Sequence, residues 1–176
     1  KGRIKALDDA NLEIRRGEFV AIQGPSGSGK STLLSMIGAL DKPDSGEIIV
    51  AGERLNQQHD LSRFRARKIG FIFQLHNLLP SLTALENVQI PMFELNLSRK
   101  EARERAKKLL ELVGLSERAE HLPTGNLDSK TEEKILQLLR SINKQQGVTL
   151  ILVTHDQTVA DTADRVIKIL DGRILD

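Results

Sequence analysis

The sequence of 176 residues contains no cysteine, no tryptophan and no tyrosine. The absence of cysteine excludes disulfides, thiol catalysis and cysteine-based metal sites, and it suits a reducing compartment. No apolar run approaches the ~18 residues that cross a membrane, and the opening residues do not form a secretory signal peptide. We therefore expect that any association with a membrane is peripheral.

A dominant charge is lacking as well. The 26 Lys and Arg residues nearly balance the 24 Asp and Glu residues, which leaves a net charge of +2. Because so small an excess gives no broad basic surface, we expect no nucleic-acid partner. The length suits one domain with a core of its own, and a hydrophobic content of 39% is ordinary for a globular protein.

Strand-like and helix-like segments alternate along the chain. Short apolar stretches predict strands at residues 19–22, 47–50, 69–73, 149–153, 165–170 and 173–175. Periodic apolar positions predict helices at residues 32–40, 98–113 and 129–146. The second helix opens on a capping box at Ser98, and Gly114 ends it. Continuously apolar strands alternating with helices favour an α/β fold with a mostly parallel sheet covered on both faces.

One stretch matches the phosphate-loop pattern G-x-x-x-x-G-K-[ST], namely Gly24-Pro25-Ser26-Gly27-Ser28-Gly29-Lys30-Ser31. It follows a predicted strand and opens a predicted helix, which is the setting that such a loop needs. The glycines let backbone amides turn inward around a phosphate, and the helix N-terminus adds partial positive charge. Lys30 supplies a point charge for the outer phosphates, and Ser31 supplies a hydroxyl for Mg²⁺. A chance match should occur in well under ~1% of chains of this length.

Three weaker stretches follow in order: Gly70-Phe-Ile-Phe-Gln74 with the adjoining residues 77–88, Thr124-Gly-Asn-Leu-Asp-Ser129, and Val153-Thr-His-Asp156. Behind a phosphate loop, and in this order, they make the chain resemble the ABC transporter ATPases. The resemblance covers essentially the whole chain. It is closest to the subfamily that powers lipoprotein-release, macrolide-export and cell-division permeases.

The resemblance implies a P-loop NTPase fold, with a mostly parallel sheet and antiparallel β strands in the N-terminal part. It implies a single domain over residues 1–176, within which residues 75–123 form a helical subdomain. The function implied is ATP binding and hydrolysis, with Mg²⁺, in a homodimer that sandwiches two ATP molecules. An integral-membrane permease is the implied partner, and export or extraction of its substrate the implied outcome. The location implied is cytoplasmic, peripheral on the inner face of the cell membrane.

Site residues follow from the same motifs. The ATP contacts fall on Gly24, Pro25, Ser26, Gly27, Ser28, Gly29, Lys30, Ser31 and Thr32. By resemblance, Gln74 joins Ser31 as a Mg²⁺ ligand, and it also senses the permease. His155 contacts the γ-phosphate and orients the attacking water, so the implied catalytic residues are His155, Gln74 and Lys30. Asn126 and Asp128 lie at the implied dimer interface. In the plainer alternatives, Gln74 is an ordinary loop glutamine, His155 is a surface histidine and Asp128 is a helix cap.

Leu78, Leu79 and Leu82 form an apolar stretch close to Gln74. They are either part of the core or a surface that receives a cytoplasmic helix of the permease, and we expect the second. Other members of the P-loop class fit less well. Soluble ABC proteins of translation or DNA maintenance carry tandem phosphate loops or long coiled-coil insertions, and a metabolite kinase would not need Gln74 and His155 in this order.

The chain departs from the family after Pro123. There the family continues into a signature loop, a helix and an apolar strand ending in Asp-Glu-Pro, which supplies the aspartate that organises Mg²⁺ and the glutamate that polarises water. Here Pro123 runs straight into Thr124, so a segment is missing between 123 and 124. Upstream, the aromatic residue that stacks on adenine in this family has no counterpart, and we expect that the chain begins inside the domain.

Two explanations of the missing segment compete: residues absent from the sequence as written, or a true deletion. A true deletion would expose neighbouring apolar strands at about 1.5–3 kcal/mol per large side chain. Since native stability is only ~5–15 kcal/mol, absent residues are the better explanation. A true deletion would instead make the chain a nucleotide-binding module that does not hydrolyse ATP.

Overall fold

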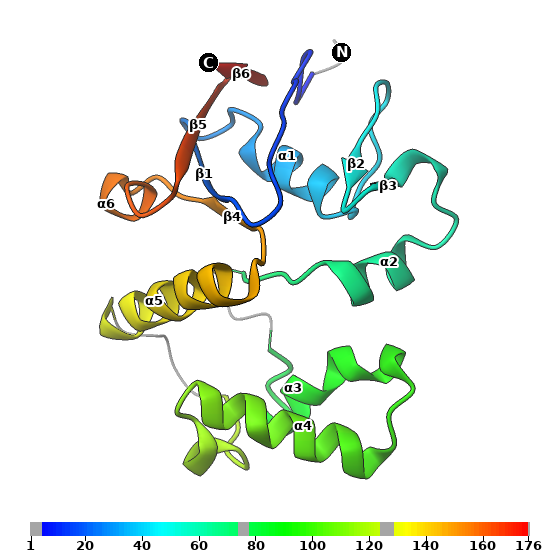
Figure 1. Cartoon of the computed structure of the whole chain (residues 1–176), viewed down its shortest axis with the longest axis vertical. Helices are drawn as coiled ribbons and strands as arrows, with labels where there is room; N and C mark the ends of the chain where they lie inside the picture. The colour runs from blue at the N-terminus through cyan, green and yellow to red at the C-terminus, as the bar shows by residue number, and fades with distance from the viewer. Residues whose placement is uncertain (1–4, 74–77, 124–128, 176) are drawn as a thin grey trace. The chain divides into compact units, whose positions relative to one another are not determined.

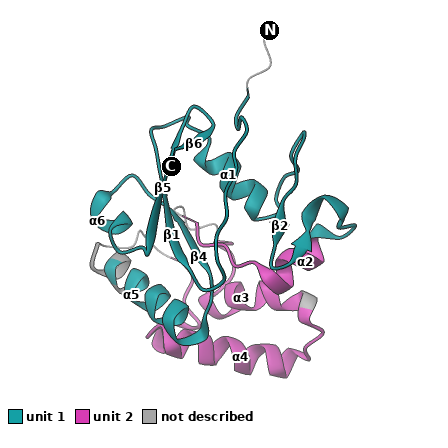
Figure 2. Cartoon of the chain, turned by 45° about the horizontal axis from the view of Figure 1, so that its top comes forward, with its two compact units in different colours: residues 1–61, 127–176 teal, residues 62–126 magenta. Residues whose placement is uncertain are grey.

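The computed structural model describes residues 5–73, 78–123 and 129–175. The chain forms two compact units, one from Lys1–Leu61 with Leu127–Asp176 and one from Ser62–Asn126 (Figure 2). The helical segment expected at residues 75–123 falls inside the second unit, and its boundaries stay a prediction. Within the described ranges, no helix is both long enough and apolar enough to cross a membrane.

A four-stranded sheet in the order β4-β1-β5-β6 forms the centre of the first unit (Figure 1). β1 (Phe19–Gln23) pairs in parallel with β4 (Leu150–Val153) and with β5 (Arg165–Leu170). β6 (Arg173–Leu175) returns antiparallel to β5. A separate antiparallel pair joins β2 (Ile49–Val50) to β3 (Glu53–Arg54). The mostly parallel sheet with antiparallel strands beside it confirms the predicted fold class.

The helices of this unit are α1 (Lys30–Ile37), α5 (Ser129–Gln146), α6 (Gln157–Ala160) and the short 3₁₀ turn η1 (Leu55–Gln57). Val20 and Ile22 of β1 are buried in one core with Leu33 of α1. Because side chains alternate across a strand, Phe19 points to the opposite face. There the guanidinium of Arg140, on α5, lies 5.2 Å from the centre of the Phe19 ring. β1 therefore sits between α1 and α5, as its continuously apolar sequence predicts.

An ion pair reinforces the contact of α5 with the sheet. Arg140 Nη2 donates to Asp164 at 2.6 Å, and the amide of Phe19 donates to the other carboxylate oxygen at 2.9 Å. The hydrogen bond from Arg140, followed by the one from the Phe19 amide, lowers the pKa of Asp164. Asp164 thereby joins α5, the start of β1 and the start of β5.

Asn143 connects the last turn of α5 to the segments that precede β1 and β4. Only 5% of this residue is exposed. Its Nδ2 donates to the carbonyl of Gly17 at 2.8 Å and to that of Val148 at 2.7 Å. Gly147, at a φ of 64°, ends the helix as predicted. One buried amide group thus satisfies two carbonyls from segments far apart in sequence.

Replacement of Asn143 by alanine is expected to lower the free energy of unfolding by about 1–3 kcal/mol, because two carbonyls lose their donor inside the protein. Urea denaturation followed by circular dichroism measures the change. Gln145→Ala is the matched control, since Gln145 lies two residues on and is exposed. An equal loss of stability in the two variants would contradict the assignment.

The second unit is helical. Its helices are α2 (which begins in the first unit, Leu61–Lys68), α3 (Ala84–Gln89) and α4 (Arg99–Leu112), with 3₁₀ turns η2 (Ile90–Leu95) and η3 (Ser116–Arg118). Leu85, Met92, Ala106 and Leu110 form its buried core. A capping box at Ser98 opens α4, as predicted, and a second one at Thr83 opens α3. Each box satisfies helix amides that have no partner within the helix.

The strand predicted at residues 69–73 is wrong, because the structure assigns no strand there. Ile72 is 67% exposed and Phe73 is 53% exposed. An extended segment becomes a strand only when a neighbour accepts its backbone hydrogen bonds, and within the described residues no strand pairs with this one. Among the described residues, β4 likewise pairs with a strand on one side only.

Candidate nucleotide site

The predicted phosphate loop forms a tight turn between β1 and α1. Gly27 and Gly29 take left-handed conformations, with φ of 79° and 101°, and the amide of Ser28 donates to the Pro25 carbonyl at 3.2 Å. Within the described part of the chain, no hydrogen-bond acceptor is recorded for the amides of Gly27, Gly29, Lys30 and Ser31. Several free amides at the start of a helix form a concave, electropositive site for an anion.

The side chain of Lys30 lies against this loop. Its Nζ donates to the carbonyls of Gly24 at 2.8 Å and Pro25 at 2.6 Å, and it lies 3.4 Å from Ser28 Oγ. Ser28 is almost completely buried. The ammonium is therefore held at the loop, where it adds a full positive charge to the partial charges of the free amides. Together these groups fit a polyphosphate.

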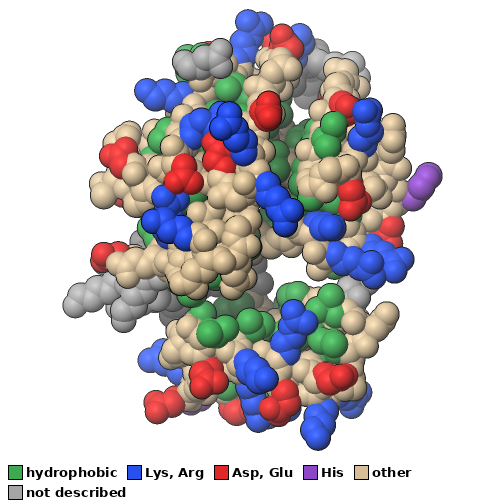
Figure 3. Space-filling view, viewed as in Figure 1, with side chains coloured by type: hydrophobic (Ala, Val, Ile, Leu, Met, Phe, Trp, Pro, Cys, Tyr) green, Lys and Arg blue, Asp and Glu red, His purple; other side chains and the backbone are tan. Residues whose placement is uncertain are grey.

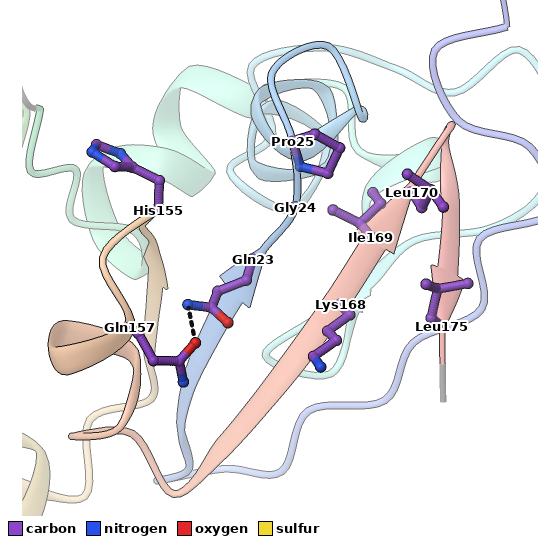
Figure 4. A pocket seen from close by; sticks show the side chains of 9 residues that line it. All are labelled: Gln23, Gly24, Pro25, His155, Gln157, Lys168, Ile169, Leu170 and Leu175. Carbon is purple, nitrogen blue, oxygen red and sulfur yellow. Dashed lines mark hydrogen bonds between the residues drawn. The ribbon is translucent and has the colours of Figure 1, made fainter.

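His155 lies at the same edge of the sheet. The amide of Thr154 donates to the Ile22 carbonyl at 3.3 Å, which extends the β1–β4 pairing by one residue. His155 follows, exposed, and lines with Gly24 and Pro25 a hollow of about 380 Å³ (Figure 4). The next residue, Asp156, caps α6 by accepting from the amide of Thr158 at 2.7 Å. The structure thus places His155 beside the loop, at the carboxyl ends of parallel strands, where ligands of α/β proteins bind.

Three more polar residues line the hollow: Gln23, Gln157 and Lys168 (Figure 4). Gln23 Nε2 donates to Gln157 Oε1 at 3.4 Å, and Gln23 stands opposite Lys168 in the β1–β5 register. The motifs did not indicate these residues. In the sequence, they differ from other polar residues only in lying at or near the end of an apolar strand. The strand pairing that brings them together is a property of the fold.

Other predicted site residues cannot be placed. Gln74, Asn126 and Asp128 lie outside the described residues, as does Thr124 at the junction that follows Pro123. Of the two predicted Mg²⁺ ligands, only Ser31 is described, and it is exposed on the first turn of α1. In the ranges that the structure describes, no group of three or more His, Asp or Glu side chains could hold a metal ion. Ser31 therefore presents one exposed hydroxyl beside the loop.

Hydrogen bonds from one side chain fix the backbone of the apolar stretch at Leu78, Leu79 and Leu82. Asn87 accepts from the Leu79 amide at 2.9 Å and donates to the carbonyls of Leu79 and Leu82 at 3.1 and 3.0 Å. The residues Leu78 and Leu79 are about half exposed, so neither belongs to the core. Hydrophobic side chains are visible at the surface of the unit that carries α3 and α4 (Figure 3). Charged side chains of both signs are interspersed with them on the face in view.

Comparison with known proteins gives consistent matches. The family model described as ABC transporter matches residues 7–151. An uncharacterized ABC transporter ATP-binding protein of Thermotoga maritima is 43% identical over 203 residues, covering 98% of this chain and 86% of the relative. The lipoprotein-releasing system ATP-binding protein LolD of Bacteroides thetaiotaomicron is 39% identical over 204 residues, covering 98% of this chain and 94% of that protein.

A solved structure is similar as well. The dimeric, post-hydrolysis state of the ATP-binding cassette MJ0796, bound to ADP and Pi, superposes with a TM-score of 0.88 at 41% identity. The match covers 97% of this chain and 89% of that one. MJ0796 is a protein of Methanocaldococcus jannaschii. The superposition covers nearly all of both chains.

The lengths of these alignments bear on the missing segment. They extend over 203 and 204 residues, whereas this chain has 176. The relatives therefore hold residues inside the matched region that have no counterpart here. The alignments do not locate these residues, so their position between 123 and 124 stays a prediction.

Proposed function

Since the chain belongs to the ABC transporter family, we propose that it is the ATP-binding and hydrolysing subunit of a transporter, coupling the nucleotide to a membrane permease. The proposal rests on the turn at residues 24–31. Its free amides and the ammonium of Lys30 form one positively charged concavity at the N-terminus of α1.

The residues at and around the loop contribute to the proposed function in different ways. The amides of Gly27 and Gly29 and the ammonium of Lys30 hold the outer phosphates. Ser31 offers its hydroxyl to Mg²⁺, which neutralises phosphate charge when bound. His155, exposed beside the loop, contacts the γ-phosphate and orients the water that attacks it. Gln74 completes the Mg²⁺ and water contacts.

We propose a homodimer as the working form. MJ0796, with which the chain superposes, is dimeric in the post-hydrolysis state. Two copies of this chain would sandwich two ATP molecules, with Asn126 and Asp128 at the interface. Pro25, Ser26 and Gly27 of the loop are exposed, so the surface of a second copy can close over a bound nucleotide.

The partner we propose is an integral-membrane permease, with the subunit on the cytoplasmic face of the cell membrane. Relatives carry the names of a lipoprotein-releasing system and of a macrolide export protein, MacB of Rhodopirellula baltica, which is 40% identical and of whose length the match covers 30%. These names support export or extraction of a substrate. The direct test is co-purification: the subunit should be recovered with membranes that contain the permease and not with membranes that lack it.

Hydrolysis is the step that depends most on the missing segment. The alternative is a module that binds ATP without hydrolysing it, and the family matches favour the hydrolysing role. An assay of ATP turnover on the intact protein separates the two. Turnover stimulated by the permease supports the proposal, and binding without any turnover supports the alternative. For the 176 residues of the sequence we expect slow turnover, because the segment that by resemblance carries the catalytic glutamate is missing.

A charged substitution at Leu79, such as Leu79→Glu, is expected to uncouple transport while ATP affinity stays at the parent value. A charge at the centre of an apolar contact costs about 2 kcal/mol or more, or roughly 30-fold in partner affinity. Transport in vesicles and ATP binding in solution measure the two effects. Leu112→Glu is the matched control, because Leu112 is 73% exposed on the same unit. Normal transport by Leu79→Glu would refute the contact.

A further inference from the structure

The hairpin turn between β5 and β6 contacts the phosphate loop on its outer side. The amide of Gly172 donates to the carbonyl of Ser28 at 2.9 Å, although 144 residues separate them. The carbonyl of Gly172 in turn accepts from the amide of Asp8 at 2.9 Å. The loop, the C-terminal hairpin and the segment near the N-terminus therefore meet at one point.

The three segments approach so closely that only glycine fits. A Cβ added to Gly29 would lie 2.5 Å from the carbonyl oxygen of Ala6, and one added to Gly172 would lie 2.8 Å from the same atom. Gly29 and Gly172 also have φ of 101° and 78°, which side chains disfavour. Backbone rather than side chains therefore makes this junction.

The hydrogen bond determines the direction of one peptide unit. A trans peptide is planar, so its carbonyl and its N–H point in opposite directions. The Ser28 carbonyl belongs to the same peptide as the Gly29 amide, which is one of the free amides of the loop. When Gly172 holds the Ser28 carbonyl outward, the Gly29 N–H must point inward.

We propose that Gly172 is a positioning residue for nucleotide binding, whose amide orients the Ser28–Gly29 peptide so that the Gly29 N–H faces the phosphates. The inference rests on the proposed function, because the ligand of the loop is taken to be ATP. The turn itself is held by a side-chain contact, in which Arg173 Nη2 donates to Asp8 at 2.7 Å. This hydrogen bond, and then the one from Lys5, lowers the pKa of Asp8, so the contact is charged at neutral pH.

The chain contains a matched control for Gly172. The β2–β3 hairpin turns at Ala51 and Gly52, with φ of 51° and 80°, and the β5–β6 hairpin turns at Asp171 and Gly172, with φ of 47° and 78°. Nothing lies within 4 Å of a Cβ built on Gly52. Gly52→Ala therefore introduces the same backbone strain as Gly172→Ala without the collision.

The experiment is a titration of both variants and the parent with a fluorescent ATP analogue, beside thermal unfolding by circular dichroism. Gly172→Ala is expected to weaken nucleotide affinity about tenfold, the loss of one hydrogen bond to a charged group. Gly52→Ala should keep the parent affinity. Parent-like affinity in Gly172→Ala, or an equal loss in Gly52→Ala, overturns the inference. Absence of binding by the parent instead overturns the proposed function.

If Gly172→Ala does not fold, Arg173→Gln decides, since it loosens the turn while leaving its backbone unchanged. The Arg173 side chain is 68% exposed in its pair with Asp8, so the expected loss of affinity is about threefold. Arg54→Gln, which loses the contact with Glu47 beside the other hairpin, is the control and should bind like the parent. Parent-like affinity in Arg173→Gln would overturn the inference in that case.

Discussion

Replacement of Lys30 by alanine is expected to abolish measurable ATP binding. The ammonium is held at the loop by the carbonyls of Gly24 and Pro25, and each hydrogen bond to a charged group contributes about 1.5–3 kcal/mol. On ATP binding the ammonium exchanges these carbonyls for phosphate oxygens, and loss of two such bonds corresponds to at least roughly 100-fold in affinity. Isothermal titration calorimetry with ATP, at fixed Mg²⁺ concentration, measures the change.

Lys42→Ala is the control for this experiment. Lys42 is exposed beyond the C-terminal end of α1, and within the described residues the structure records no hydrogen bond or ion pair for its ammonium. Its removal should change the ATP affinity by no more than about twofold, as for an ordinary surface substitution. If Lys30→Ala kept the affinity of the parent, the loop would not be the nucleotide site and the proposed function would lose its main support.

Insertion of the segment that relatives carry is expected to have the other large effect. Placing the corresponding residues of MJ0796 between Pro123 and Thr124 should raise ATP turnover by about 10²–10⁴-fold, the usual contribution of a positioned general base. By resemblance, this segment brings the glutamate that polarises water and the aspartate that organises Mg²⁺. Steady-state release of phosphate, measured with and without the insertion, gives the ratio directly.

Two observations on the fold support the same insertion. In the part of the chain that the structure describes, β4 has a paired strand on one side only, and residues 69–73 form no strand. A further apolar strand would give β4 a second neighbour, so the insertion should raise the melting temperature as well. A variant of the insertion with glutamine in place of the glutamate separates the effect on melting temperature from the effect on turnover. It should show the higher melting temperature without the faster ATP turnover. Equal turnover with and without the insertion would contradict the assignment of the segment.

Short-range features of this protein were readable from the residues alone. The helix at residues 129–146 and the capping box at Ser98 both depend on side chains only a few positions apart. The phosphate loop was readable for the same reason, because its glycines, its lysine and its flanking strand and helix are contiguous. A pattern of this kind determines local backbone conformation wherever the chain folds.

One predicted strand was wrong, and one group of site residues could not be predicted from the sequence. The apolar run at residues 69–73 looked like a strand, yet no partner accepts its backbone in the described structure, and a strand exists only as part of a ladder. The grouping of Gln23, Gln157 and Lys168 was equally unreadable. It depends on the pairing of β1 with β5, which holds Lys168, and with β4, which precedes Gln157, and no local pattern specifies either pairing.

The sequence by itself determined which residues can bind phosphate and which segments can become helices or buried strands, because those properties are set by composition over a few neighbouring positions. Only the tertiary structure decided how the loop is held. The contacts of Ser28 with Gly172 and of Asn143 with Gly17 join residues more than a hundred positions apart. Backbone groups carry most of these contacts, and since every residue has such groups, the sequence could not mark the ones that meet.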